Sequence, residues 1–420
     1  MEQTHMRTWL GTACVAAVAA SCAMAGHWPG WRGPAGNGQS VEKDLPLKWD
    51  AKENVRWKIE LPGPGNSSPV VWGDRVFLTQ SLDKEGKRRA VMCFQRGDGK
   101  LLWQKETSYD EAEPTHATNP YCSATPVTDG KRMIASLGAA GLVCYDFDGN
   151  ELWRYGVGKY GHIWGNASSP ILCGDLVILL GGPGERQFLL AVNKIAGKKA
   201  WQVDFAGGGN KEYLGSWSTP IIARVGDHDE MIVCLPEKLK AFDPKTGTEL
   251  WSCDGLGKLA YSTPVCSADG IVVAFSGYGG PAMAVRAGGK GDVTETHRLW
   301  HHAKGNTQCI GSPVIVGEYA YLIRESGAAQ CYELKTGKEV WNKERLGKTT
   351  WSSLVEADGR LYVANDDGEI HVLMANPKFE LLARNVLDGT GKIQASIAVS
   401  DGELFIRSHR HLWCISPKGP

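Results

Sequence analysis

The sequence predicts an all-β protein, an eight-bladed β-propeller of four-stranded antiparallel blades whose ring is closed by an N-terminal strand. Three observations predict it. The composition, with 52 Gly and 16 Trp among 420 residues, indicates many tight turns between aromatic-rich strands. One segment recurs along the chain, and residues 241–251 are its most complete copy. The tryptophans that end these copies are spaced at intervals typical of propeller blades.

The recurring segment has the pattern of a β-hairpin. One strand ends near Ala241, and the turn that follows contains Asp243, which can hydrogen-bond its own backbone, and Gly247, which can take a positive φ. Trp251 lies on the returning strand. We therefore expect each indole to pack on the small residue of its own hairpin and on the glycine turn of the neighbouring copy.

Each copy opens with a short segment that is usually Ser-Ser-Pro or Ser-Thr-Pro. The copies start at Ser67, Ser123, Ser168, Ser218, Ser262, Gly311, Trp351 and Ala395. The repeat tryptophans stand at positions 57, 103, 153, 201, 251, 300 and 341, at intervals of 46, 50, 48, 50, 49 and 41 residues, which leaves room for four short strands and their turns. Copy five has an enlarged turn at residues 286–293, and copy seven has Leu381 and Leu382 in the region of the Trp.

The last copy supplies only three strands, so its outer edge would stay open. Residues 54–60 alternate apolar and polar side chains with period two, which predicts a half-buried strand, and they carry Trp57 at the fitting position. We therefore expect this strand to complete the eighth blade. Residues 54–420 then form one domain without an internal boundary.

The first 25 residues predict a signal peptide, because Arg7 precedes a short apolar run and Ala23-Met24-Ala25 fits the cleavage pattern. The run is too short to span a membrane, and no later stretch is apolar enough. The expected location is the periplasm or the exterior. Cys22 leaves open a lipid anchor, although a lipobox usually opens with Leu.

Residues 26–53 follow as an expected N-terminal arm. Gly and Pro are too frequent at its start for a helix or a long strand, and Trp28 and Trp31 need cover. The arm is therefore expected to pack on the propeller rather than to hold a ligand.

Charge and cysteine usage exclude some classes of protein. Lys plus Arg and Asp plus Glu number 46 each, so no field favours nucleic acid, and a monomer is expected. Of twelve Cys, Cys93, Cys144 and Cys331 hold the small-residue position of the repeat. Equivalent positions lie one blade apart, beyond disulfide reach, so buried free thiols are expected.

The pattern A-x-D-x-x-T-G-x-E-x-W of residues 241–251 resembles the tryptophan-docking repeat of pyrroloquinoline-quinone (PQQ) type propellers, and the resemblance covers nearly all of the mature chain. That family includes quinoprotein alcohol and glucose dehydrogenases and the non-enzymatic lipoprotein of the outer-membrane β-barrel assembly machine. The opening motif of residues 28–34 and the long turn 286–293 resemble a secreted bacterial branch. The repeat is specific for the fold and says little about activity.

The resemblance to quinoprotein dehydrogenases implies a disulfide of adjacent cysteines over the quinone, carboxylates for Ca²⁺, an Asp base and an Arg. The sequence has no adjacent Cys pair. Its carboxylate groups occur in turn-like contexts, where solvated side chains are expected; they are Asp227, Asp229, Glu230, Asp366 and Asp367.

Two histidine groups lack a third metal ligand; they are His301 with His302, and His409 with His411, which would share one face of a strand.

Propeller ligands usually lie where the loops between blades converge on the central channel. Three loops supply polar and aromatic residues there: Glu113, His116, Asn119 and Tyr121; residues 162–166; and Lys211, Glu212, Tyr213 and Trp217. The candidate funnel residues are His116, Asn119, His162, Trp164, Asn166 and Trp217. Such a funnel suits a peptide strand, a glycan or a quinone.

The sequence therefore favours an exported, non-enzymatic binding scaffold of the cell envelope, whose partner is a protein or a glycan. No catalytic residue, metal or cofactor is predicted. The alternative is a PQQ-dependent oxidoreductase that holds PQQ with Ca²⁺ near His162 and Trp164.

Overall fold

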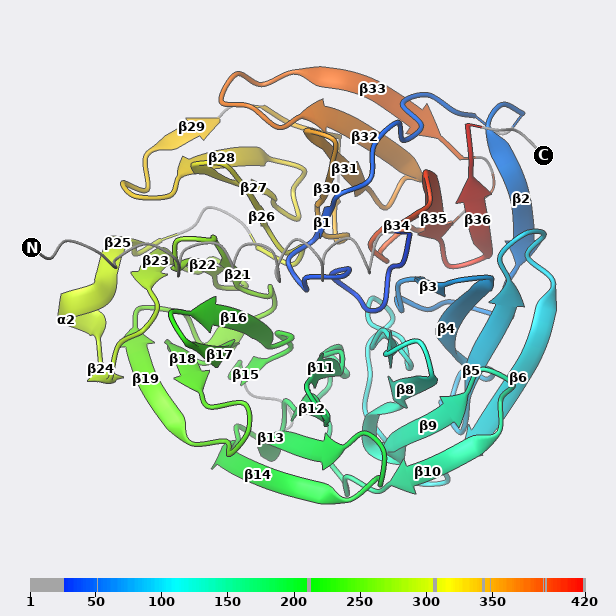
Figure 1. The fold of residues 1–420 in the computed structure, drawn as a ribbon, viewed down its shortest axis with the longest axis horizontal. Helices are drawn as coiled ribbons and strands as arrows, with labels where there is room; N and C mark the ends of the chain where they lie inside the picture. Colours follow the sequence, from blue (N-terminus) through cyan, green and yellow to red (C-terminus); the bar gives the residue numbers. More distant parts are fainter. Residues whose placement is uncertain are drawn as a thin grey trace, which may run out of the picture.

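The structure is a computed structural model that describes residues 26–50, 52–209, 213–304, 308–341, 344–347, 349–387, 389 and 391–417. Eight sheets are arranged radially around a common centre (Figure 1). The predicted eight-bladed propeller is thus confirmed. The predicted signal peptide and Cys22 lie outside the described residues, as do Lys211 and Glu212 of the third funnel loop.

The first four blades follow the chain, each with its first strand at the centre and its last at the periphery (Figure 1). Blade 1 contains β3 (Val70–Trp72), β4 (Arg75–Ser81), β5 (Arg88–Gln95) and β6 (Leu101–Ser108). Blade 2 contains β7 (Val127–Thr128), β8 (Arg132–Ser136), β9 (Leu142–Asp146) and β10 (Glu151–Tyr155), with the 3₁₀ turn η1 (Gly138–Ala140). Blade 3 contains β11 (Ile171–Cys173), β12 (Leu176–Gly181), β13 (Arg186–Asn193) and β14 (Lys199–Ala206). Blade 4 contains β16 (Ile221–Val225), β17 (His228–Leu235), β18 (Lys238–Phe242) and β19 (Glu249–Asp254).

The other four blades complete the ring. Blade 5 contains β21 (Val265–Cys266), β22 (Ile271–Phe275), β23 (Ala282–Arg286) and β25 (Arg298–His302). Blade 6 contains β26 (Val314–Val316), β27 (Tyr319–Ile323), β28 (Ala329–Glu333) and β29 (Glu339–Trp341). Blade 7 contains β30 (Val355–Ala357), β31 (Arg360–Ala364), β32 (Glu369–Met374) and β33 (Leu381–Val386). Blade 8 contains β34 (Ala398–Ser400), β35 (Glu403–Arg407), β36 (His411–Ile415) and, as its outer strand, β2 (Val55–Glu60).

Three further pairings join segments that the repeat does not account for, and all three are parallel. The arm strand β1 (Gln39–Ser40) pairs with β30 at the inner edge of blade 7. The enlarged turn of copy five forms β24 (Gly291–Asp292), which adds a fifth strand to blade 4 beside β19, and the short helix α2 (Thr294–His297). Two loop segments, β15 (Gly215–Ser216) and β20 (Leu259–Ala260), pair with each other.

The predicted packing of each tryptophan against the small residue of its own hairpin is confirmed. Across each outer hairpin a Trp lies opposite a small residue, in the pairs Trp103–Cys93, Trp153–Cys144, Trp201–Ala191, Trp251–Ala241, Trp300–Ala284, Trp341–Cys331 and Trp57–Cys414. In blade 7 the equivalent register position pairs Val372 with Ala383. The degenerate copy thus keeps the strand pairing without an indole.

Most of these indoles also dock on the turn of the next blade through a hydrogen bond from Nε1 to a backbone carbonyl. The pairs are Trp57 to Arg96 (2.7 Å), Trp103 to Phe147 (2.9 Å), Trp153 to Lys194 (2.9 Å), Trp201 to Pro244 (3.1 Å), Trp300 to Leu334 (2.7 Å) and Trp341 to Pro377 (3.0 Å). Gly247 shows why these turns need glycine, since its φ is +74° and a Cβ would lie 2.7 Å from the Trp201 ring.

A closed ring of hydroxyl groups joins the inner strands of all eight blades. In each blade one Ser or Thr of the opening segment accepts the backbone N–H of its counterpart in the preceding blade. The ring runs through Ser68, Thr125, Ser169, Thr219, Thr263, Ser312, Ser353 and Ser396, with N···O distances of 2.8 to 3.1 Å. The backbone N–H of Ser396 donates to the hydroxyl of Ser68, so the hydrogen-bonded ring closes between the eighth blade and the first.

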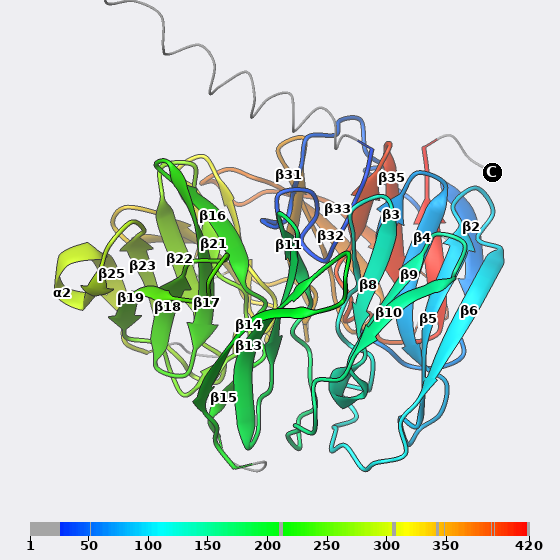
Figure 2. The same ribbon diagram turned by 60° about the horizontal axis from the view of Figure 1, so that its bottom comes forward.

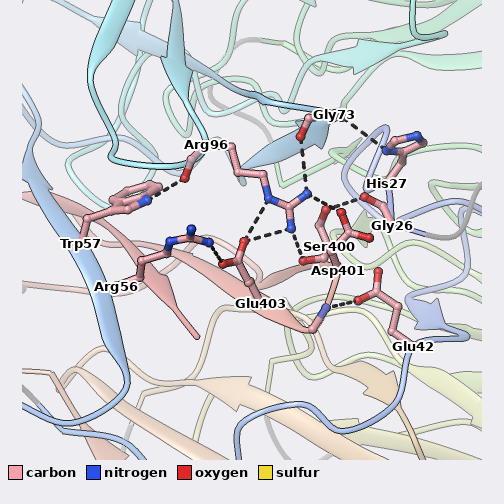
Figure 3. Close-up of polar contacts among 11 residues, drawn as sticks. Gly26, His27, Glu42, Arg56, Trp57, Gly73, Arg96, Ser400, Asp401 and Glu403 are labelled. Atoms are coloured by element: carbon pink, nitrogen blue, oxygen red, sulfur yellow. Dashed lines mark hydrogen bonds and ion pairs between the residues drawn. The ribbon is translucent and has the colours of Figure 1, made fainter. Parts of the chain in front are cut away.

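The predicted closure of the eighth blade by residues 54–60 is confirmed, because β2 pairs with β36 and places Trp57 opposite Cys414. A charged network at this seam joins blades 8 and 1 (Figure 3). The Arg96 guanidinium donates to Glu403 Oε2 at 2.9 Å and to Asp401 Oδ2 at 2.8 Å, while Arg56 pairs with the other oxygen of Glu403.

The segment that starts at Gly26 lies over the other end of the ring from β15 (Figure 2). Trp28 is fully buried and exchanges backbone hydrogen bonds with Val71 at 2.8 and 2.9 Å. The buried Arg32 guanidinium donates to the carbonyls of Leu354 and Pro313. Burial lowers the pKa of Arg32 to about 9. These contacts tie the segment to blades 1, 6 and 7.

Candidate functional site

A cavity of about 890 Å³ lies at the centre of the propeller, where the inner strands begin. Among the described residues, seven Trp and Tyr side chains line it: Trp31, Trp164, Tyr213, Trp217, Tyr261, Tyr278 and Trp351. Four amide side chains join them: Asn66, Asn119, Gln308 and Gln394. Its volume lies at the upper end of the range of about 300–1,000 Å³ found for small-molecule sites.

One end of the cavity is formed by the hydroxyl ring. Five ring members line the cavity, namely Ser68, Thr125, Ser169, Ser353 and Ser396. Trp31 reaches the ring from the arm, and its indole N–H donates to Ser396 at 3.2 Å. We expected the arm only to pack on the propeller. The contribution of Trp31 to the cavity wall was therefore not predicted. The sequence held no signal for it, because the arm and Ser396 are far apart in the chain.

The loop before blade 3 supplies one aromatic wall. Trp164 is half-buried, and the His116 ring lies 4.5 Å from it between centroids. Asn119 fixes this loop, since its side-chain amide donates to the carbonyl of Trp164 at 2.7 Å and to that of Asn166 at 3.2 Å. His116, Asn119 and Trp164 all line the cavity.

The loop before blade 4 supplies a second wall. The Trp217 indole donates to the carbonyl of Gly165 at 2.8 Å, and Tyr261 meets its ring edge-on at 5.2 Å. Burial raises the pKa of Tyr261 to about 12, so its hydroxyl stays protonated at neutral pH. Tyr213 and Tyr278 are 67% and 70% exposed and line the outer part. The aromatic walls are therefore held in place by the protein.

Two of the predicted funnel residues do not line this cavity. His162 is fully buried behind the wall, where its ring packs edge-on against Trp217 at 5.2 Å. Asn166 turns the other way and donates to the carboxylate of Glu113. Sequence order alone could not separate them from Trp164, because a loop places neighbouring side chains on different sides.

Glu113 and Tyr121 of the first funnel loop also belong to the support and not to the cavity. The Glu113 carboxylate pairs with Arg89 at 2.6 Å, and both side chains are almost fully buried. The Arg89 guanidinium also lies over the rings of Tyr109 and Tyr121, 4.8 and 5.0 Å from their centroids. This pair connects blade 1 with the loops before blades 2 and 3.

A polar network backs the cavity on the side of blade 8. The His409 ring nitrogen Nε2 lies 3.2 Å from Gln394 and 3.3 Å from Asn66. Burial, helped by the nearby charges of Arg407 and Lys392, lowers the pKa of His409 to about 4. The His409 imidazole is therefore neutral where it contacts the side-chain amides of Gln394 and Asn66. His409 precedes β36 instead of lying in it, so the expectation that it shares a strand face with His411 was wrong.

The two candidate histidines of blade 5 contact backbone carbonyls of the protein. His301 contacts the carbonyl of Gly255 and His302 that of Gly337, both at 2.8 Å. Within the described parts of the chain, no three His, Cys, Asp or Glu side chains are grouped as a metal site would need.

Two of the candidate carboxylates differ from the expected solvated state. Glu230 is 1% exposed and accepts the indole N–H of Trp251 at 2.7 Å. Asp366 is mostly buried and pairs with Lys392 at 3.3 Å, and burial raises its pKa. Turn-like sequence context did not reveal that neighbouring blades cover these positions.

The described lining does not fit a calcium-bound quinone. PQQ carries three carboxylates, and Ca²⁺ needs about six to eight oxygen ligands. Among the described residues that line the cavity, the basic side chain is Lys258 and the carboxylate is Glu325. One lysine does not balance the three carboxylates of PQQ, and one carboxylate does not supply the oxygen ligands that Ca²⁺ needs.

A model of the family described as outer membrane protein assembly factor BamB matches residues 87–343, from blade 1 to the end of blade 6. The curated outer membrane protein assembly factor BamB of Shewanella oneidensis is 26% identical over 220 residues, which are 49% of this chain and 50% of that protein. The chain thus spans about half the length of this curated relative.

Solved structures share the fold at low identity. BamB from Moraxella catarrhalis has a TM-score of 0.60 and 14% identity, covering 86% of this chain and 96% of its own. A europium-containing methanol dehydrogenase reaches 0.70 at 10% identity over 93% and 98%. Quinohemoprotein alcohol dehydrogenase from Comamonas testosteroni reaches 0.71 at 10% identity over 96% and 82%. These likenesses show the architecture alone. Because the family match covers more than half of the chain, this propeller belongs to the outer membrane protein assembly factor BamB family.

Proposed function

We propose that this protein is a non-enzymatic binding scaffold of the cell envelope, in which the central cavity and the loops at its mouth bind an envelope protein or glycan. The observation that carries the proposal is the lining of the cavity, which combines aromatic, amide and hydroxyl side chains. Such side chains recognise a ligand by shape and hydrogen bonds. The family description, an assembly factor for outer membrane proteins, supports a role in binding other envelope components.

The proposed location is outside the cytoplasm. The family and the curated relative are both named for the outer membrane, and residues 1–25 predict a signal peptide. No helix among the described residues has both the length and the apolar character to cross a membrane. Fractionation with N-terminal sequencing tests the location. Cleavage after Ala25 supports a soluble exported protein, a lipid on Cys22 supports an anchored one, and an uncut cytoplasmic chain contradicts both.

The second candidate is a PQQ-dependent oxidoreductase. It is favoured by the size and aromatic walls of the cavity and by the shared fold of the methanol and alcohol dehydrogenases. The mismatch between PQQ and the charges of the described lining favours the scaffold instead.

A titration with PQQ and Ca²⁺ separates the two candidates. We expect no heat of binding, no quinone absorbance after gel filtration and no oxidation of alcohols or sugars with an artificial electron acceptor. Saturable binding together with turnover would replace the scaffold by the enzyme.

Photo-crosslinking in cells tests the scaffold directly. A photoreactive amino acid at Tyr278, which is 70% exposed at the mouth of the cavity, is expected to give adducts with envelope components. The matched control is Leu152, which is 50% exposed on the outer strand β10. Equal labelling at both sites, or none at Tyr278, would contradict a binding role for the mouth. Light scattering of the purified protein checks the proposed monomer.

A further inference from the structure

We propose that the central cavity is a binding site for a short neutral oligosaccharide. This inference rests on the proposed binding function and names its ligand class. It is drawn from three properties of the cavity, namely its flat aromatic walls, the hydrogen-bond donors at its closed end and the balance of its charges.

The aromatic walls present ring faces that the protein holds still. Trp217 is fixed by its hydrogen bond to Gly165 and by the edge of Tyr261. Asn119 holds the backbone of Trp164 through its carbonyl, and the His116 ring packs against the Trp164 indole at 4.5 Å between centroids. Sugar rings pack their C–H faces on such flat π-surfaces. Because the rings are already ordered, a saccharide would not have to order them on binding.

The closed end of the cavity offers hydrogen-bond donors. Each hydroxyl oxygen of the ring already accepts a backbone N–H, as Ser169 does from Thr125 at 3.0 Å. A serine hydroxyl also has one hydrogen to donate, and among the described residues no acceptor is recorded for the ring hydroxyls. Ser68, Ser169 and Ser353 line the cavity, so we assign their hydroxyl hydrogens to ligand oxygens.

Trp351 adds a further aromatic side chain to the lining of the cavity. Its indole Nε1 is buried and has no hydrogen-bond partner among the described residues, so Trp351 offers its ring and not its N–H to a ligand. A saccharide carries hydroxyl and ring oxygens all around its edge and can meet several donors at once.

The charges of the lining favour a neutral ligand. Lys258 and Glu325, of opposite sign, line the cavity, and a polyanion such as PQQ would meet no excess of positive charge among the described lining residues. A peptide strand would bind by extending a sheet edge, whereas the walls described above are side-chain faces of loops. The volume of about 890 Å³ is sufficient for a small oligosaccharide.

Tryptophan fluorescence of the full-length protein tests the inference, with maltotriose, cellotriose and chitotriose as neutral probes and trigalacturonate as an anionic one. We expect at least one neutral probe to change the emission saturably in the millimolar range or below, and trigalacturonate to bind no better. Trp164→Ala should weaken this binding about tenfold, while Trp164→Phe retains most of it. Tyr278→Ala, at an exposed position, provides a second variant that is not expected to affect folding.

The matched control is Trp72→Ala, since Trp72 stacks on His27 at 4.2 Å away from the cavity. It should bind like the wild type. No saturation with any neutral probe, or unchanged affinity in both Trp164→Ala and Tyr278→Ala, overturns the inference. Tighter binding of trigalacturonate, or binding of a strand-forming peptide alone, also overturns it. If the saccharides fail while Tyr278 still crosslinks to an envelope protein, the scaffold function stands without this ligand.

Discussion

The indole N–H of Trp251 donates to the carboxylate of Glu230 at 2.7 Å, whereas the other docking tryptophans donate to backbone carbonyls of the next blade. The next blade is the one with the enlarged turn, and its Gly288 N–H approaches the same carboxylate at 3.4 Å. A buried side chain of blade 4 therefore replaces the backbone acceptor that the regular turn provides elsewhere.

Removing the Glu230 acceptor should destabilise the fold. Glu230→Leu leaves the Trp251 indole N–H without its acceptor in a buried position, and we expect the free energy of unfolding to fall by about 1–3 kcal/mol. Glu230→Gln keeps an acceptor oxygen and should lose less. Urea denaturation of both variants measures the difference, and equal losses would contradict this role of the carboxylate.

The hydroxyl ring should contribute to stability at each of its members. Thr219→Val keeps the shape of the side chain but removes the oxygen that accepts the Ser169 N–H at 3.0 Å. We expect a loss of about 1–3 kcal/mol on unfolding in denaturant. Thr219→Ser restores the oxygen and should recover most of the loss. A valine variant as stable as the wild type would show that the ring contact contributes nothing.

The seam between blades 8 and 1 should be sensitive to Glu403. Its side chain is 6% exposed and pairs with Arg96, which is 11% exposed. Glu403→Ala leaves Arg96 without this buried partner, and the expected loss is about 3–5 kcal/mol. Asp401 also contacts Arg96 but is 65% exposed, so Asp401→Asn should cost less than about 1 kcal/mol. Similar melting curves for the two variants would contradict a structural role of the buried pair.

Stability should decrease in mild acid because of His409. The pKa of His409 is about 4 in the folded protein, whereas the ordinary histidine value of 6.5 applies to the unfolded chain. As the pH falls, the unfolded chain therefore binds the proton first. The free energy of unfolding should therefore decrease from about pH 6.5 to about 4. His409→Gln should flatten this part of the profile, measured by denaturation at several pH values.

His228 provides the control with the opposite sign. Hydrogen bonds to Asp227 and Glu230 raise its pKa, so protonation of His228 adds stability as the pH falls. Replacing His228 should therefore steepen the decrease of the free energy of unfolding in acid, whereas replacing His409 should flatten it. A profile that does not change in the His409→Gln variant would exclude that imidazole as the cause.

The cysteines should be inert in the native protein. The ten described cysteines are all free, and eight of them are buried. Burial raises the pKa of Cys93, Cys144 and Cys331 to about 12, which leaves little reactive thiolate near pH 8. A thiol reagent should label the native protein slowly and the denatured protein fully. Rapid native labelling of these three, or disulfides found by mass spectrometry, would contradict this.

The parts of the fold that follow the repeat could be predicted from the sequence. A Trp and a small residue at fixed spacing determine a hairpin register, so the pair Trp251–Ala241 could be predicted from the sequence alone. The parallel strand β24 and the buried state of Glu230 were not, because both arise where one copy departs from the repeat and contacts its neighbour.

The candidate site was predicted in part for a related reason. Loop position placed His116, Asn119, Trp164 and Trp217 at the channel. Local sequence does not determine which way a loop side chain turns, so His162 and Asn166 could not be assigned to the support. Trp31 and Trp351 contribute through contacts between distant segments, for which the sequence contains no periodic signal.

The pairing of β2 with β36 has a consequence for the way the chain is made. The strand at Val55–Glu60 is synthesised long before its partner at His411–Ile415. Until that partner has been made, the outer edge that β2 will occupy does not exist. Contacts this distant in sequence form slowly, and the hydroxyl ring and the Arg96–Glu403 seam also depend on this last step. The assembled propeller is thus a state that the chain reaches only once β36 has been made, and a nascent chain that lacks β36 can hold blades but not a ring.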